Sequence, residues 1–106
     1  MSAQYLYLTT RGRKSGLPRE IEIWFTQIEE TFYVIAEYET SEWVRNIRAD
    51  SKVRVRVGAD EFPATARILS PASDAELHHR VQELSRLKYG WGDGLAVELS
   101  RNRVMV

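Results

Sequence analysis

The sequence contains no cysteine, which excludes disulfides, thiolate catalysis and cysteine-ligated metals. It also has no apolar run near the roughly 20 residues that a membrane-spanning helix requires. Residues Met1 to Gln4 lack the character of a signal peptide, so we expect a cytoplasmic protein with no membrane span. Fifteen cationic and fifteen anionic residues cancel, so no global field draws the chain onto nucleic acid.

Catalytic signatures are missing as well. No serine lies in a nucleophile-elbow motif, and no nucleophile, base and orienting acid form a recognisable set. His78 and His79 are adjacent in a predicted helix, so they point in different directions and cannot form the i, i+4 pair of a helical zinc site. We therefore predict no catalytic side chain and no metal site.

What is present is an ordinary globular composition, with 43% hydrophobic and 28% charged residues. A length of 106 residues predicts one domain spanning 1–106. No repeat or linker divides it.

The most unusual segment is Thr9 to Arg19, with the sequence TTRGRKSGLPR, here called the cationic loop. It holds four cations and two glycines between two predicted strands. Glycines permit positive φ and so allow backbone amides to converge on one point, while the cations supply charge around it. The loop predicts an anion site, with phosphate as the first candidate. The alternative is an ordinary solvated turn that happens to be basic.

The string Gly12-Arg13-Lys14-Ser15 resembles the end of a nucleotide-binding P-loop, but the context excludes that interpretation. The lysine follows arginine instead of glycine, and the glycine required earlier is missing. The alternating strand after Pro18 also replaces the helix whose N-terminus would hold phosphates.

Alternating apolar residues predict strands over residues 5–10, 19–28, 32–37, 52–57, 61–69 and 95–99. Thr40 or Ser41 begins a short helix that ends near Ala49, and a capping box at Ser73 begins a longer one that ends at Gly90. Hairpin-like connections with a single short helix inside the sheet favour a mainly β, α+β fold: an antiparallel barrel of about six strands with one longer C-terminal helix.

Two further groups of residues are candidates for a binding site. Trp43, Asn46 and Arg48 lie on the short helix, where core packing of the Trp ring and solvation of the two polar side chains are the alternatives. Tyr89 and Trp91 lie among glycines after the long helix, where their rings either line a pocket or pack against a helix C-cap.

These segments together resemble the deazaflavin (F420)-dependent nitroreductase and quinone reductase family, a branch of the flavin and deazaflavin oxidoreductases. The resemblance covers nearly the whole chain. It is carried by LYLTTRGRKSGLPR from Leu6, YVIAE from Tyr33, the WxxN-type helix WVRNIRAD from Trp43, and the hairpin that follows.

The resemblance implies an FMN-binding type of split β-barrel that binds coenzyme F420 and transfers hydride to a quinone-like, nitro or unsaturated small molecule. The implied cofactor-binding residues are Arg13, Lys14, Ser15, Arg19, Ala36, Trp43, Asn46 and Arg48, with Tyr89 and Trp91 toward the substrate. A cofactor that carries the reaction agrees with the missing catalytic set.

The segment Glu37 to Glu42 departs from the family because it lacks glycine and adds three acids, which would repel an anionic cofactor tail. Two alternatives therefore stay open: an FMN-dependent oxidoreductase, and a non-catalytic barrel that binds another anion or cofactor.

We also predict a homodimer. Trp24 lies on the glutamate face of its strand, and Tyr33 and Ile35 make the third strand apolar on both faces, so apolar surface needs a cover.

Overall fold

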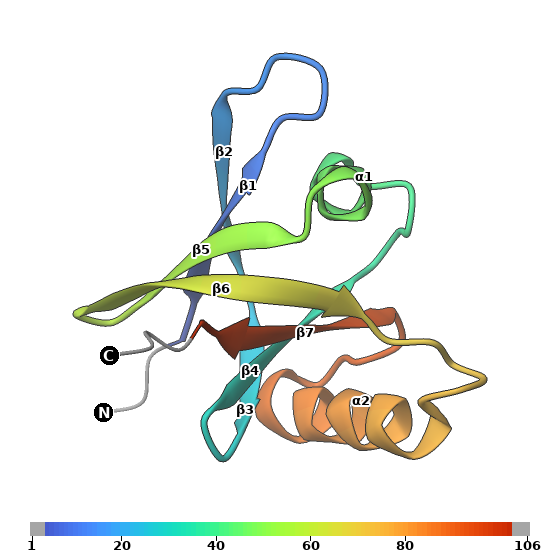
Figure 1. Cartoon of the computed structure of the whole chain (residues 1–106). Helices are drawn as coiled ribbons and strands as arrows, with labels where there is room; N and C mark the ends of the chain where they lie inside the picture. The colour runs from blue at the N-terminus through green and yellow to red at the C-terminus, as the bar shows by residue number, and fades with distance from the viewer. Residues whose placement is uncertain (1–3, 103–106) are drawn as a thin grey trace.

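A computed structural model describes residues 4–102 (Figure 1). Within them the chain forms seven strands and two helices, in the order β1 Leu6–Arg11, β2 Pro18–Ile23, β3 Phe25–Ile28, β4 Thr31–Ala36, α1 Glu42–Ala49, β5 Lys52–Val57, β6 Asp60–Ile68, α2 Ala75–Tyr89 and β7 Leu95–Arg101.

The strands form one sheet, in the order β2-β1-β5-β6-β7-β4-β3, and all paired neighbours are antiparallel. The two edge strands, β2 and β3, are consecutive in the chain and are joined through Trp24. The sheet therefore curls back toward itself without closing, which is a split antiparallel barrel. The predicted mainly β fold class is confirmed.

The prediction of one strand over 19–28 is wrong. Residues before Trp24 pair with β1, and residues after it pair with β4 at the opposite edge of the sheet. Ile21, Ile23 and Phe25 keep their alternation across this junction because all three pack on the same barrel core. The pattern reports which face is buried and carries no sign of the change of partner.

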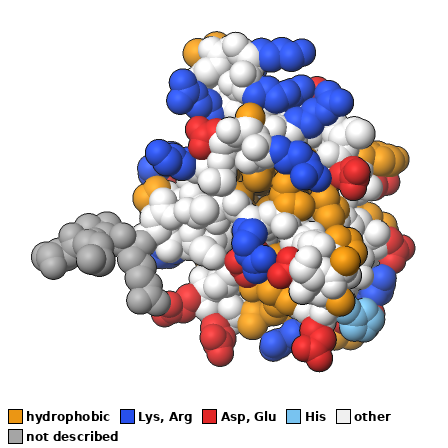
Figure 2. All heavy atoms as spheres, turned by 45° about the vertical axis from the view of Figure 1, so that its right-hand side comes forward, with side chains coloured by type: hydrophobic (Ala, Val, Ile, Leu, Met, Phe, Trp, Pro, Cys, Tyr) orange, Lys and Arg blue, Asp and Glu red, His pale blue; other side chains and the backbone are white. Residues whose placement is uncertain are grey.

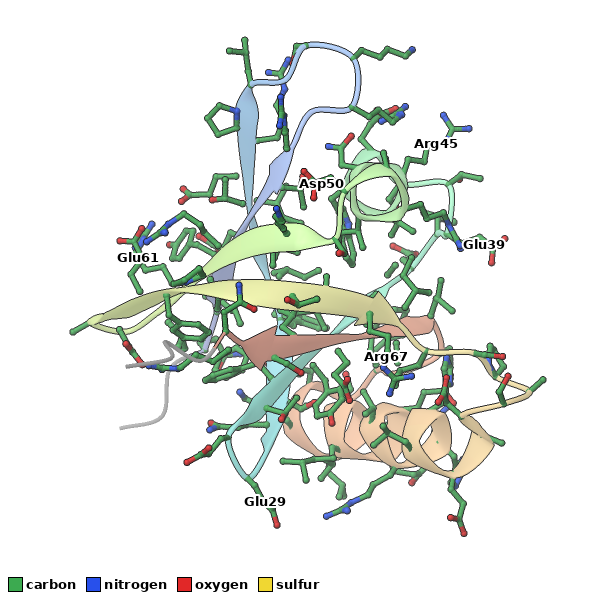
Figure 3. All side chains as sticks on the ribbon, in the orientation of Figure 1. Glu29, Glu39, Arg45, Asp50, Glu61 and Arg67 are labelled. Carbon is green, nitrogen blue, oxygen red and sulfur yellow. The ribbon has the colours of Figure 1, made fainter. Side chains whose placement is uncertain are left out.

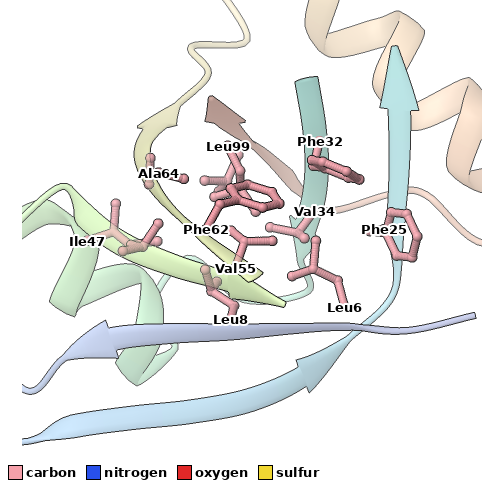
Figure 4. Close-up of a cluster of buried hydrophobic side chains, with 13 residues drawn as sticks. Leu6, Leu8, Phe25, Phe32, Val34, Ile47, Val55, Phe62, Ala64 and Leu99 are labelled. Atoms are coloured by element: carbon pink, nitrogen blue, oxygen red, sulfur yellow. The ribbon is translucent and has the colours of Figure 1, made fainter. Parts of the chain in front are cut away.

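The barrel interior is filled by side chains from six strands and from α1 (Figure 4). Its fully buried members include Leu6, Leu8, Val55, Val97 and Leu99, each 0% exposed. Burial of such side chains is the main stabilising term of the fold. Ile47 of α1 belongs to the same cluster, so the short helix is anchored to the barrel that carries the cationic loop.

Helix α2 covers the outer face of β4 and β7. Tyr33, Leu69, Val81 and Ala96 form a second buried cluster beneath it, and Ile35 packs against this cluster. The two-sided apolar character of β4 is thus satisfied within the chain, so this part of the argument for a dimer is wrong. Leu87 of α2 is turned away from this cluster and is 84% exposed.

The N-terminus of α2 differs from the predicted capping box. Asp74 is the N-cap instead of Ser73, and its side chain makes no capping hydrogen bond. Its carboxylate accepts from Ser70 N at 2.8 Å and from Arg67 Nη1 at 3.1 Å. Arg67 also donates to Glu98 Oε1 at 3.1 Å, so one guanidinium ties β6 to β7 and to the start of α2 (Figure 3).

A close backbone approach fixes the entry into β7. A Cβ at Gly94 would lie 2.1 Å from the Ala36 carbonyl oxygen, so only glycine fits. Within residues 4–102, no helix has the length and hydropathy needed to cross a membrane.

Candidate functional site

The cationic loop connects β1 to β2 at one end of the barrel (Figure 1). Its backbone is closed on itself, because Gly12 N donates to Leu17 O and Gly16 N donates to Gly12 O, both at 2.8 Å. Gly16 has the expected positive φ of 73°, whereas a Cβ at Gly12 would lie 2.7 Å from Ser15 Oγ and would displace that hydroxyl. The glycine amides therefore do not converge on an anion as predicted, and the loop presents its side chains instead.

Those side chains line a pocket of about 380 Å³ between the loop and α1, here called the loop pocket. It brings together six of the predicted site residues: Arg13, Lys14, Ser15, Arg19, Trp43 and Asn46. Thr10, Gly12, Ile21 and Glu42 complete its lining. Among residues 4–102, Lys14 and Arg19 form no ion pair, so both charges are available to an anion.

Asn46 is the polar connection between α1 and the loop. It is 3% exposed, contrary to the solvated position that the sequence pattern favoured. Its Nδ2 donates to Thr10 Oγ1 at 3.1 Å, and its Oδ1 accepts from Arg13 N at 3.2 Å and from Arg13 Nη1 at 3.0 Å. A buried amide with these partners fixes the loop against the helix.

Arg13 also forms an ion pair with Glu42, one of the three acids in the segment Glu37 to Glu42. Its Nη1 donates to Glu42 Oε2 at 2.7 Å, and the Arg13 side chain is only 19% exposed. This hydrogen bond, with the charge of Arg13, lowers the pKa of the Glu42 carboxyl. Glu42 thus holds and neutralises one cation of the loop at neutral pH.

A larger groove of about 680 Å³ lies next to the loop pocket, at the split between β2 and the end of β4. Most of its lining is aromatic or aliphatic, and its charged side chains are all acidic. We call it the aromatic groove; its lining is Tyr5, Glu22, Ile23, Trp24, Phe25, Thr26, Tyr33, Ile35, Ala36, Glu37, Tyr38, Ser41, Trp43, Ser85 and Trp91.

Trp43 lines both cavities, so the two are adjacent at this residue. One side of this meeting point carries the loop cations, and the other carries apolar rings. Lys and Arg side chains gather over the end of the molecule where the loop lies, with hydrophobic side chains exposed below them (Figure 2). This division suits a ligand with an anionic part and a flat apolar part.

The remaining four predicted site residues do not lie together in the loop pocket. Ala36 and Trp91 line the aromatic groove, while Arg48 lies exposed on α1 and lines neither cavity. Tyr89 is also outside the groove lining. Its ring stacks on Trp24 with centroids 4.5 Å apart, and its hydroxyl is hydrogen-bonded to the backbone of Phe25.

Sequence reasoning missed several groove residues. The sequence pattern predicts Trp24 only as part of a dimer contact, and it predicts no role in the site for Tyr5, Glu22 or Thr26. A large aromatic side chain between glutamates on a polar strand face was a usable signal for Trp24. Thr26 had no signal, because its position depends on the change of partner strand at Trp24.

Among residues 4–102, no three His, Asp or Glu side chains gather as metal ligands would. His78 is buried, and its Nε2 accepts from Ala96 N at 3.2 Å.

Comparison with known proteins identifies the family of this chain. The model of the F420H2-dependent quinone reductase family matches residues 1–91. The chain belongs to this family. The match spans the cationic loop, α1 and the groove strands, so membership of the F420H2-dependent quinone reductases covers both cavities.

Solved structures support the fold. An F420-H2 dependent reductase, FDR-A, superposes with a TM-score of 0.73 at 21% identity, over 92% of this chain and 94% of that chain. A protein from Listeria innocua assigned as a pyridoxamine 5′-phosphate oxidase gives 0.75 at 16% identity, over 94% and 85%. A protein solved as a domain-swapped dimer gives 0.76 at 20% identity, over 95% and 82%. Because their sequence identities to this chain are low, the three structures establish only a shared fold. No curated protein matches the sequence significantly.

Proposed function

We propose that this member of the F420H2-dependent quinone reductase family is an oxidoreductase that binds reduced coenzyme F420 and passes hydride to a quinone-like, nitro or unsaturated small molecule. The observation that carries the proposal is the meeting of the cationic loop pocket and the aromatic groove at Trp43. A coenzyme with an anionic tail and a flat ring system needs both surfaces side by side.

The residues present fit this coenzyme. Lys14 and Arg19 would meet phosphate oxygens, with the Ser15 hydroxyl as a further hydrogen-bond donor. Trp43 and Ala36 would lie beside the ring, where the small Ala36 side chain leaves room for a flat group. When bound, the coenzyme supplies the hydride. The chain itself binds, orients and excludes water from the reacting partners, which requires no nucleophile.

FMN is a second candidate because of the state of Arg13. With Glu42 and Asn46 holding that guanidinium, two uncommitted loop-pocket cations remain, Lys14 and Arg19. Two cations suffice for the single phosphate of FMN, whereas the longer acidic tail of F420 would extend past the loop.

The test is an equilibrium titration of wild-type protein with F420 and, separately, with FMN, followed by cofactor fluorescence. We expect saturable F420 binding that Arg19→Ala weakens about fivefold, the factor for one charge contact near water. Arg80→Ala removes an exposed arginine from α2 and should leave the affinity unchanged. Tighter FMN binding would favour the second candidate, and binding of neither would favour a non-catalytic barrel.

We also propose a homodimer in solution. Trp24 is 40% exposed and Leu17 is 58% exposed, and a related fold was solved as a domain-swapped dimer. Light scattering at micromolar concentration tests this, and a monomer mass would refute it.

A further inference from the structure

The aromatic groove differs from the loop pocket in the sign of its charge. Its lining includes two carboxylates, Glu22 and Glu37, and no Lys, Arg or His. Glu37 has no ion pair or hydrogen bond among residues 4–102, and Glu22 accepts only the Tyr7 hydroxyl, at 2.8 Å. Neither carboxylate therefore forms an ion pair within the described part of the chain.

The same groove carries exposed aromatic side chains. Trp24 is 40% exposed and Tyr38 is 63% exposed, and both line it. The negative face of an aromatic ring attracts a cation, and an indole ring does so most strongly. Aromatic faces and unpaired carboxylates in one groove thus favour the same kind of ligand.

A buried hydroxyl in the groove lining is also unsatisfied. Thr26 is 6% exposed, and its Oγ1 has no hydrogen-bond partner in the described part of the chain. This oxygen is itself shielded from the open groove, so the class of ligand is argued from the carboxylates and the aromatic rings alone.

We propose that the aromatic groove selects a flat aromatic cation as the hydride acceptor, held between Trp24 and Tyr38 and opposite the carboxylates of Glu22 and Glu37. The inference rests on the proposed function for its reaction, and on the groove alone for its binding. The loop pocket would hold the anionic tail of the coenzyme, and its ring would lie beside Trp43 and Ala36 at one end of the groove, so that the rest of the groove is left for the cationic acceptor.

A cationic acceptor also suits the chemistry. Hydride from the reduced deazaflavin forms one C–H bond on the ring of the acceptor, which becomes neutral. The coenzyme is oxidised by two electrons and releases one proton to solvent. Because the product has lost its charge, it also loses its attraction to Glu37, which favours release.

The test uses three bicyclic probes of similar shape: N-methylquinolinium as the cation, quinoline as the neutral form and 2-naphthoate as the anion. Binding to the wild-type protein without coenzyme is measured by isothermal titration calorimetry at low salt. We expect the cation to bind at least about tenfold more tightly than the anion, since two carboxylates each contribute up to about fivefold.

Glu37→Gln should reduce the preference for the cation about fivefold. Glu39→Gln is the matched control, because Glu39 is an exposed acid two residues away that does not line the groove. Trp24→Leu should lower the affinity for the cationic probe more than the affinity for the neutral probe. Circular dichroism checks that each variant folds.

Equal affinity for the three probes, or an equal effect of the Glu37 and Glu39 variants, would overturn the inference. The proposed function fails separately. If the cation binds selectively but F420 does not bind, the groove assignment holds and the redox assignment falls.

Discussion

The pairing of Glu42 with Arg13 predicts that removing an acid improves coenzyme binding. Glu42→Gln leaves Arg13 Nη1 held by Asn46 Oδ1 at 3.0 Å, but removes the carboxylate that lies 2.7 Å from it. The guanidinium then stays in place with its charge available to an anionic ligand. An exposed pair is worth at most about a fivefold change in an equilibrium constant, so we expect F420 affinity to rise about two- to fivefold.

The same substitution should lower thermal stability. Glu42 lies in the first turn of α1, where a negative charge interacts favourably with the helix dipole. Its lowered pKa means that the ion pair contributes stability above the usual titration range of a glutamate, and that this contribution is lost as the pH falls through the lowered value. We expect a melting temperature a few degrees lower at neutral pH.

The assay is fluorescence titration of F420 against wild type, Glu42→Gln and Glu76→Gln, with a thermal melt of each. Glu76 occupies the first turn of α2, far from the loop in sequence, so its variant matches the loss of a first-turn charge without changing Arg13. Unchanged or weaker F420 binding by Glu42→Gln would refute the idea that Glu42 competes with the ligand for Arg13.

Three further predictions concern stability. Asn46→Ala removes a buried amide with three partners and should lower the free energy of unfolding by about 1–3 kcal/mol, whereas Asn102→Ala, at an exposed site, should change it by less than about 0.5 kcal/mol in urea titrations. Gly94→Ala should lower the free energy of unfolding by about 3 kcal/mol, because the new Cβ would clash with backbone. Gly58→Ala should lower it by only about 1 kcal/mol, because a Cβ there meets open space and only the φ of 58° is unfavourable. Similar losses of stability for the two variants would contradict the close approach at Gly94. Burial raises the pKa of Tyr33 from 10.0 to about 12, so the neutral phenol contributes its full stability below pH 10, and this contribution is lost as the pH rises through 12. Tyr33→Phe should therefore make the free energy of unfolding fall less steeply with pH in this range. Equal slopes for wild type and variant would show that Tyr33 does not cause the fall.

The sequence predicts the fold class well because hydrophobic alternation records which face of each strand is buried. The hairpin of Lys52–Val57 with Asp60–Ile68 and the helix that ends at Gly90 are found where the pattern puts them. The break at Trp24 is not predictable in this way, since the burial pattern is the same on both sides of it. That break is what creates the split in the barrel.

The candidate site, like the fold, is only partly predictable from the sequence. Composition marks the cationic loop, and the loop pocket does collect Arg13, Lys14 and Arg19. The aromatic groove draws on β2, β3, β4 and α1, so no local pattern reveals it. The role of Glu42 is likewise a tertiary fact: the sequence shows an acid that would repel a phosphate, while the structure shows it paired with one of the cations.

The most direct test of the central claim is the rate at which the protein oxidises reduced F420 in the presence of a simple quinone, followed by the returning absorbance of the oxidised coenzyme. The account predicts turnover above the uncatalysed rate, saturable in coenzyme, with Arg19→Ala raising KM for the coenzyme about fivefold while kcat is kept. A wild-type rate equal to that of the protein-free mixture, with quinone and with N-methylquinolinium alike, would contradict it.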